Sequence, residues 1–315
     1  MTQVLKAGRE RAPGQLGRRS TAGSKPRLSP NWLPYLLVIP ILAFEGVFVL
    51  YPIVKGILTS FKSQALGAQN SYTFSNYSRM VDDPVFWQVI RVTLIFTAGV
   101  VVLMLVVGLI IALLLNWSFR GRGFVRGILS IPWALPDIPV VLTFLLMADP
   151  NFGIFNRMAS WLGFGHHNAF FTSPHLAFAS IIVLTVWKGF PFYALITLSA
   201  LQAVPDELLE AARVDGAGAI RRFRSVVLPS ITPTLCLLAV LAFIFSLQQF
   251  SLIYLTTGGG PGNDTTTLSI NIYTQAFQFF NYSYASAIAV VGLFLSIIGT
   301  VLFVYIERRV VASRR

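Results

Sequence analysis

Residues 89–115 read VIRVTLIFTAGVVVLMLVVGLIIALLL, and Arg91 is the only charged residue in this run. A helix rises 1.5 Å per residue, so a run of this length can cross the ~30 Å hydrocarbon core of a bilayer. The whole chain is 55% hydrophobic and only 11% charged, whereas a soluble domain carries about 25% charged residues. So few charges cannot coat a water-soluble surface, and the sequence therefore predicts a membrane protein.

Five further apolar blocks of similar length are separated by polar segments. They cover residues 33–58, 127–147, 176–201, 232–255 and 285–306. The alternating segments of about ten residues that are typical of membrane β-barrels are absent, and helices are then the structure that satisfies the backbone in lipid. We expect an all-α membrane protein with six transmembrane helices in residues 31–315, preceded by a basic, flexible cytoplasmic tail, residues 1–30.

Lys and Arg are concentrated in alternate connecting segments. The rich segments are the tail, residues 120–126, residues 213–224 and residues 308–315, and the opposite segments carry Lys55, Lys62, Arg79 and Arg157. Because cytoplasmic loops are enriched in Lys and Arg, we expect a multi-pass inner-membrane protein with both termini in the cytoplasm. The net charge is +12, but the Lys and Arg residues form no patch interleaved with aromatic residues. We therefore expect this chain to contact membrane lipid and to bind no nucleic acid.

The segment between the fourth and fifth blocks, residues 205–229, reads PDELLEAARVDGAGAIRRFRSVVLP. Pro205 can open a helix at its first position, and Asp206 favours the positive end of the helix dipole. Gly216 can adopt positive φ and end this helix, after which we expect a second, basic amphipathic helix that ends at Pro229. Such a cytoplasmic helix-turn-helix suits docking into a partner's groove or binding to the lipid surface, and the pattern alone leaves both open.

Part of this segment resembles the EAA loop of the membrane subunits of ATP-binding-cassette (ABC) importers. The resemblance lies in Glu210-Ala211-Ala212, Asp215-Gly216 and the spacing to Leu228-Pro229. It implies that residues 201–230 form a coupling loop that inserts into an ATPase subunit, with Glu210 and Gly216 as key positions. The implied ATPase-coupling residues are Glu210, Ala211, Ala212, Asp215, Gly216, Leu228 and Pro229.

Motifs elsewhere in residues 33–306 resemble the carbohydrate-uptake branch of this family. They are NY at 76–77, IPWALP at 131–136, WKGFPF at 187–192 and TTGGGPG at 256–262. Within that branch the chain is similar to the first permease of a pair, of the maltose or glycerol-3-phosphate type, although the two extra N-terminal spans and the large external domain of the maltose type are absent.

The resemblance implies a type I importer fold, a maltose-permease-like bundle with both termini inside. It implies four kinds of partner: a second homologous permease, a dimer of ATPase subunits, an external solute-binding protein and a sugar-like substrate. Uptake of glycerol 3-phosphate or a glycerophosphodiester by the same mechanism is one alternative. An ion-coupled secondary transporter is the other.

Polar residues within the apolar blocks are candidates for a transport site. Gln248 and Gln249 could bind sugar hydroxyls or join helices, and unwound backbone, where transport sites form, is expected near Lys188, Gly189 and Pro191. The resemblance implies that the substrate-binding positions are Lys188, Gly189, Phe192, Ala242, Phe245, Ser246 and Gln249. Several differ in chemistry from the maltose type, so the solute need not be maltose, and Lys188 could attract a phosphate.

Two carboxylates, Glu45 and Asp137, lie inside predicted spans. Ionisable residues in a membrane are costly and mark candidate functional sites. The sequence leaves two interpretations open. Either carboxylate could cap a kinked helix or form a pair, with the other or with Lys188, and either could instead couple transport to protons.

No catalytic or cofactor motif is evident. The Gly-x4-Gly-Lys-Ser/Thr signature of a P-loop is missing, and Gly258-Gly259-Gly260 is expected to form an external turn. We therefore expect no enzymatic activity and no cofactor in this chain, with ATP and Mg²⁺ bound by the partner ATPase. No metal site is expected, because His166, His167 and His175 lack a supporting carboxylate or cysteine cluster.

Overall fold

The computed structural model describes residues 32–63, 71–163 and 168–312, which form helices, turns and loops and no strand. The tail predicted at 1–30 lies outside the described residues. The chain divides into two units at Pro52 and Ile53. The helices are α1 (Trp32–Glu45), α2 (Tyr51–Ser60), α3 (Ser75–Asp82), α4 (Pro84–Asn116), α5 (Arg122–Ala134), α6 (Asp137–Met147), α7 (Ile154–Trp161), α8 (Pro174–Gln202), α9 (Asp206–Val214), α10 (Ala219–Arg222), α11 (Leu228–Leu247), α12 (Ser251–Thr256), α13 (Leu268–Tyr273) and α14 (Tyr282–Ala312), with π-helical turns η1 (Gly46–Leu50), η2 (Phe223–Val227) and η3 (Thr274–Gln278).

Each predicted apolar block corresponds to helical structure, which confirms the all-α class. Five continuous helical stretches in the described chain are long and apolar enough to cross a membrane. They are Tyr35–Ser60, Pro84–Asn116, Pro174–Gln202, Ala219–Leu247 and Tyr282–Arg309. The sixth candidate is the pair α5 and α6, which bend by 95°.

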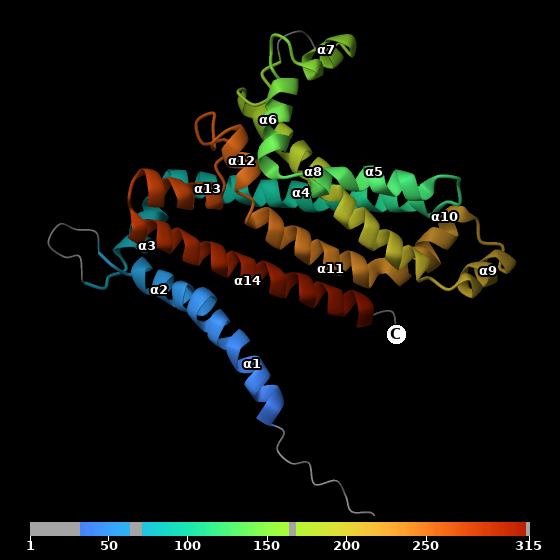
Figure 1. The fold of residues 1–315 in the computed structure, drawn as a ribbon, viewed down its shortest axis with the longest axis horizontal. Coiled ribbons are helices and arrows are strands. Elements are labelled where there is room, and N and C mark those ends of the chain that lie inside the picture. Colours follow the sequence, from blue (N-terminus) through green and yellow to red (C-terminus); the bar gives the residue numbers. More distant parts are fainter. Residues whose placement is uncertain (1–31, 64–70, 164–167, 313–315) are drawn as a thin grey trace, which may run out of the picture. The chain divides into compact units, whose positions relative to one another are not determined.

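Within the unit that begins at Ile53, α4 and α8 pack along each other and form the centre of the bundle, against which α11 packs (Figure 1). Their shared core contains Phe96, Val100, Ile181 and Tyr193, together with Leu238 of α11. A Cβ atom on Gly108 would lie 2.9 Å from Cβ of Tyr193. Small residues at such a contact allow two membrane helices to approach closely, so Gly108 sets the spacing of α4 and α8.

The sequence predicted one continuous span over residues 127–147, but the structure has two helices there, α5 and α6, separated by residues 135–136. α5 ends at Ala134, Leu135 is extended with ψ 139°, and α6 begins after Pro136. A residue that precedes proline is driven out of the helical region by the proline ring. Pro136 therefore explains why the helix stops at Ala134 and turns.

The fifth predicted span, 232–255, differs at both ends. α11 ends at Leu247, and residues 248–250 separate it from α12. At the other end, the sequence predicted that the preceding helix would end at Pro229, and this prediction is wrong. The helix runs without a break from Ala219 to Leu247, with a π turn in which the Leu228 N–H donates to the Phe223 carbonyl. This wider turn accommodates the ring of Pro229, which would crowd the carbonyl four residues earlier.

The irregular backbone expected near Lys188 is absent, because α8 continues through Gly189 and Pro191. Membrane helices tolerate an internal proline where neighbouring groups satisfy the backbone. Unwound backbone occurs instead at residues 135–136 and 248–250, in the helices that face α8.

Gly108→Ala is expected to lower the melting temperature of the detergent-solubilised protein by several degrees. The added methyl group overpacks the contact between α4 and α8, and overpacking typically costs about 1–3 kcal/mol. Gly127→Ala is the matched control, because a Cβ atom there meets no other atom within 4 Å. An equal effect of the two variants would contradict the assigned contact.

Candidate functional site

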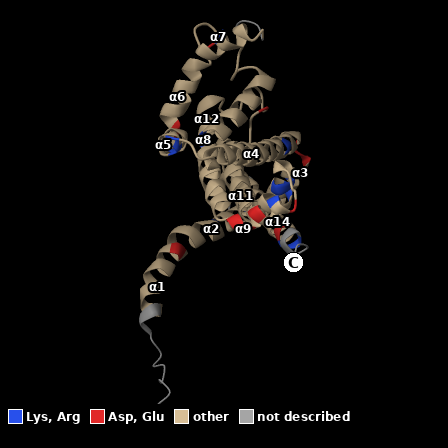
Figure 2. Cartoon of the chain, turned by 90° about the vertical axis from the view of Figure 1, so that its right-hand side faces the viewer, with Lys and Arg blue, Asp and Glu red and all other residues tan. Residues whose placement is uncertain are grey.

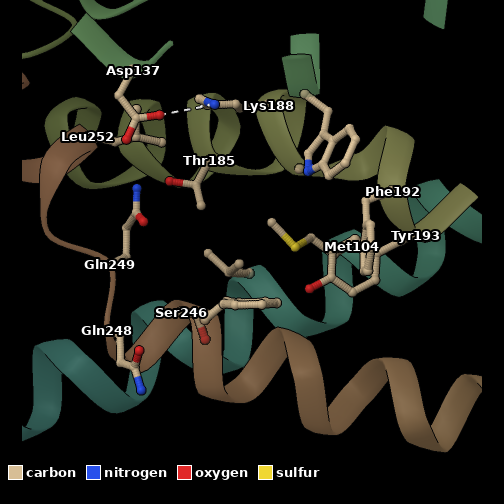
Figure 3. Close-up of a pocket in the computed structure, with 14 residues that line it drawn as sticks. Met104, Asp137, Thr185, Lys188, Phe192, Tyr193, Ser246, Gln248, Gln249 and Leu252 are labelled. Atoms are coloured by element: carbon tan, nitrogen blue, oxygen red, sulfur yellow. Dashed lines mark ion pairs between the residues drawn. The ribbon is translucent and has the colours of Figure 1, made fainter. Parts of the chain in front are cut away.

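A cavity of about 470 Å³ lies between α4, α8, the α5–α6 bend and the α11–α12 break (Figure 3). Its walls combine polar side chains with aromatic and aliphatic ones. The lining residues are Val100, Met104, Trp133, Asp137, Thr185, Lys188, Gly189, Phe192, Tyr193, Phe245, Ser246, Gln248, Gln249 and Leu252. The two breaks in the bundle thus occur at the wall of one cavity.

The structure brings most of the expected substrate-binding residues together at this cavity. Lys188, Gly189, Phe192, Phe245, Ser246 and Gln249 line it. Ala242 does not, because it is fully buried in the core that α11 shares with α4 and α8. Its small side chain packs between helices, and its role in binding a solute stays a prediction.

An ion pair connects α8 to the bend between α5 and α6. Nζ of Lys188 lies 3.0 Å from Oδ1 of Asp137 and also donates to the Leu135 carbonyl at 3.0 Å. This confirms the interpretation that Asp137 pairs with Lys188. In a continuous helix the Leu135 carbonyl would accept from residue 139, but Pro139 has no N–H. Lys188 therefore satisfies a carbonyl that the backbone cannot.

The second break is satisfied in a similar way. The carbonyl of Gln249 accepts a hydrogen bond from Oγ of Ser269 at 2.7 Å, which ties the break to α13. Figure 3 shows Gln249 on the same side of the cavity as the ion pair, whereas Gln248 points away from it. Gln248 also lines a neighbouring cavity of about 410 Å³ beside α13 and α14.

Aromatic rings occupy the end of the cavity beyond Lys188. The Trp133 and Phe192 rings are 5.8 Å apart with an interplanar angle of 31°, and Tyr193 lies beside Phe192. Flat apolar faces next to a few convergent polar groups are typical of small-molecule sites. The arrangement can contact both the hydroxyl groups and the apolar face of a sugar.

The sequence did not single out Trp133, Thr185 or Tyr193 as lining residues. Trp133 was visible only as part of the IPWALP motif, and the prolines of that motif were the available signal for a break at this point. Thr185 precedes Lys188 by three residues on α8 and so shares its face. Tyr193 carried no separate signal.

The predicted coupling loop forms α9, a turn and α10. Pro205 is the N-cap and Asp206 and Glu207 occupy the first turn of α9. Gly216 has φ 71°, as expected for the residue that ends this helix. Glu210 is exposed, and so are the apolar side chains of Leu208, Val214 and Ile220. Apolar residues that protrude from a charged loop suit contact with another protein.

This loop lies at the same end of the bundle as the start of α5 and the end of α14 (Figure 1). The loop is rich in charged residues, and Figure 2 shows charged residues around α9 and the end of α14. Of the expected coupling residues, Ala211, Ala212 and Asp215 lie on or beside α9, whereas Leu228 and Pro229 begin α11. The loop is therefore continuous with a helix that reaches the cavity.

The remaining candidates have simpler outcomes. Gly258 and Gly259 have φ 61° and 99° and form a turn after α12, as expected, and its external location stays a prediction. The described residues contain no group of three or more His, Cys, Asp or Glu that could hold a metal ion, and His166 and His167 lie outside them. Glu45 ends α1, and its role stays a prediction.

Comparisons with known proteins agree on one family. Residues 104–312 match the model of the binding-protein-dependent transport system inner membrane component. The sulfoquinovosyl glycerol transport system permease SmoG of Agrobacterium fabrum is 38% identical over 89% of this chain and 92% of its own length. The trehalose/maltose permease MalF of Thermococcus litoralis is 36% identical, over 88% and 94%. The sn-glycerol-3-phosphate permease UgpA of Yersinia pestis is 33% identical, over 91% and 98%.

The fold is also similar to that of solved structures. A chain of a bacterial alginate ABC transporter, crystallised with an alginate pentasaccharide-bound periplasmic protein, superimposes with a TM-score of 0.79. It is 23% identical, and the match covers 90% of this chain and 96% of that one. The similarity identifies the bundle as the fold of an ABC importer permease.

Ser269→Ala is expected to accelerate amide hydrogen exchange in residues 248–254. The substitution removes the donor to the partly buried Gln249 carbonyl, and a hydrogen bond typically contributes about 0.5–1.5 kcal/mol to stability. Ser296→Ala is the control, because Oγ of Ser296 donates to the Gly292 carbonyl inside the continuous helix α14. Unchanged exchange at 248–254 in Ser269→Ala would refute the role of this bond in holding the break.

Proposed function

The chain belongs to the family of inner-membrane components of binding-protein-dependent transport systems, and from this premise we propose that it forms, with a second homologous permease, the path of a sugar or sugar-like solute into the cell. It is a multi-pass permease subunit of an ABC importer. The observation that carries the solute class is the cavity, where amides and hydroxyls lie beside the rings of Trp133 and Phe192.

The relatives support this class without fixing one solute. Their names refer to a sulfoquinovosyl glycerol, to trehalose and maltose, and to sn-glycerol 3-phosphate. All are polyhydroxy compounds or their esters. Glycerol 3-phosphate or a glycerophosphodiester is the second candidate, favoured by Lys188 in the cavity wall. Membership of the binding-protein-dependent permease family argues against the alternative of an ion-coupled secondary transporter.

The ATPase subunits would dock on the loop formed by α9 and α10. The exposed Glu210 and the protruding Val214 and Ile220 provide a mixed charged and apolar contact surface. ATP and Mg²⁺ would be bound by those partner chains, and an external solute-binding protein would deliver the solute. The Lys and Arg residues of 120–126, 213–224 and 308–309 support a cytoplasmic location for the loop and the C-terminus, and the basic sequence of the tail supports the same side for the N-terminus.

The coupling path is a single helix. From Ala219 the chain is helical to Leu247, and Phe245 and Ser246 near its end line the cavity. A displacement of the loop by closure of the ATPase dimer would therefore move the cavity wall directly. ATP would shift the population of two bundle states through its different affinity for them.

Glu210→Lys is expected to reduce the ATPase that co-purifies with the tagged chain at least tenfold. A cation would replace a carboxylate at the centre of the docking surface, and like-charge contacts or lost pairs at an interface weaken it strongly. Mass spectrometry of the complex purified in mild detergent measures this, together with retention of the second permease.

The control is Glu307→Lys, which makes the same charge change at the same end of the bundle but outside the loop. It should retain the ATPase. A Glu210→Lys protein that retains its ATPase and its uptake would contradict docking at α9, and a wild-type chain that purifies without an ATPase would contradict the proposed function.

A further inference from the structure

The cavity wall contains one positive and one negative group. Of the described residues that line it, Lys188 and Asp137 are the only charged ones, and the two are paired at 3.0 Å. Their side chains are 16% and 37% exposed, respectively. The cavity therefore has a charged group on its surface without carrying a net charge.

The hydrogen-bonding capacity of Lys188 is largely used. An ammonium group has three N–H donors, of which one is directed at Asp137 and one at the Leu135 carbonyl. A phosphate or sulfonate would have to share this ammonium with a carboxylate 3.0 Å away. Two anions that share one ammonium group repel each other, which disfavours the binding of the second.

The same geometry is favourable for an uncharged polyol. A carboxylate accepts hydrogen bonds through both oxygens, so Asp137 can accept from a sugar hydroxyl while it stays paired with Lys188. Gln249 lies on the same side of the cavity as the pair (Figure 3), and amides can both donate to and accept from hydroxyls. Trp133 and Phe192 offer apolar faces to the ring.

We propose that Asp137 determines the charge specificity of the cavity. By neutralising Lys188 it makes the cavity select an uncharged glycoside or oligosaccharide over a phosphate or sulfonate ester. This inference rests on the proposed function, and it decides between the two solute classes left there. Asp137 acts as a binding residue for the hydroxyls of the solute and as the counter-ion of Lys188.

The pair also has a structural consequence that a test must separate. Lys188 ties α8 to the bend between α5 and α6, so a variant could lose binding because the bend loosens. Asp137→Asn is the appropriate change, because asparagine keeps the size and one oxygen acceptor for Lys188, removes the negative charge and replaces the second oxygen by a donor. A structural loss would weaken neutral and anionic probes alike.

The experiment measures binding to the purified permease complex in detergent without its solute-binding protein, so that selection by that protein does not enter. The probes are trehalose and trehalose 6-phosphate, which differ by one phosphate group. The wild-type complex should bind trehalose at least tenfold more tightly. In Asp137→Asn the ratio of the two dissociation constants should shift at least tenfold towards the phosphate, and more at low salt.

The double variant Asp137→Asn/Lys188→Met supplies the second test. It removes both charges, so the preference for trehalose should return. A wild-type preference for the phosphate, or an equal change for both probes in Asp137→Asn, would overturn the assignment while trehalose binding still supported the proposed function. If neither probe bound the wild-type complex, the neutral-solute assignment and the proposed solute class would both be wrong.

Discussion

The ammonium group of Lys188 lies between the carboxylate of Asp137 and the carbonyl of Leu135, 3.0 Å from an oxygen atom of each. Without it, the break at residues 135–136 would leave a backbone carbonyl unpaired, since Pro139 cannot donate. Ser269 serves the same purpose at the second break by donating to the Gln249 carbonyl. The cavity exists because two spans are interrupted and because side chains replace the hydrogen bonds that each interruption removes.

The continuous helices form the two walls of the cavity between the breaks. α4 and α8 hold one wall through the close contact at Gly108, and the helix from Ala219 to Leu247 joins the coupling loop to the other wall. The loop and one wall of the cavity are thus parts of one continuous helix. The π turn before Pro229 keeps this helix unbroken where a proline would otherwise interrupt it.

Much of the fold was predictable, because apolar runs long enough for a bilayer can satisfy their backbone only as helices. The turn at Gly216 followed from the one residue type that readily adopts positive φ. The bend at Leu135 was signalled by Pro136 and Pro139, but neither its 95° angle nor the hydrogen bond from Lys188 to the Leu135 carbonyl follows from the sequence. Pro191 led to the opposite error, because unwound backbone was predicted there and α8 continues through it. Asp137, Lys188 and Glu45 allowed several pairings, and only the packing of α8 on the bend selects one. Ala242 matched the site by spacing, and its burial in the core behind the cavity wall could not be read from the sequence.

Nucleotide-dependent accessibility of position 249 tests the account most directly. Gln249→Cys would be introduced with Cys236→Ala, so that the single native cysteine does not react. A membrane-impermeant thiol reagent would then be applied to either side of oriented membranes that contain the whole complex. We expect the cysteine to react from the cytoplasmic side without nucleotide and from the outer side when ATP is trapped. Reaction from one side only, whatever the nucleotide, would contradict a cavity that alternates under control of the ATPase.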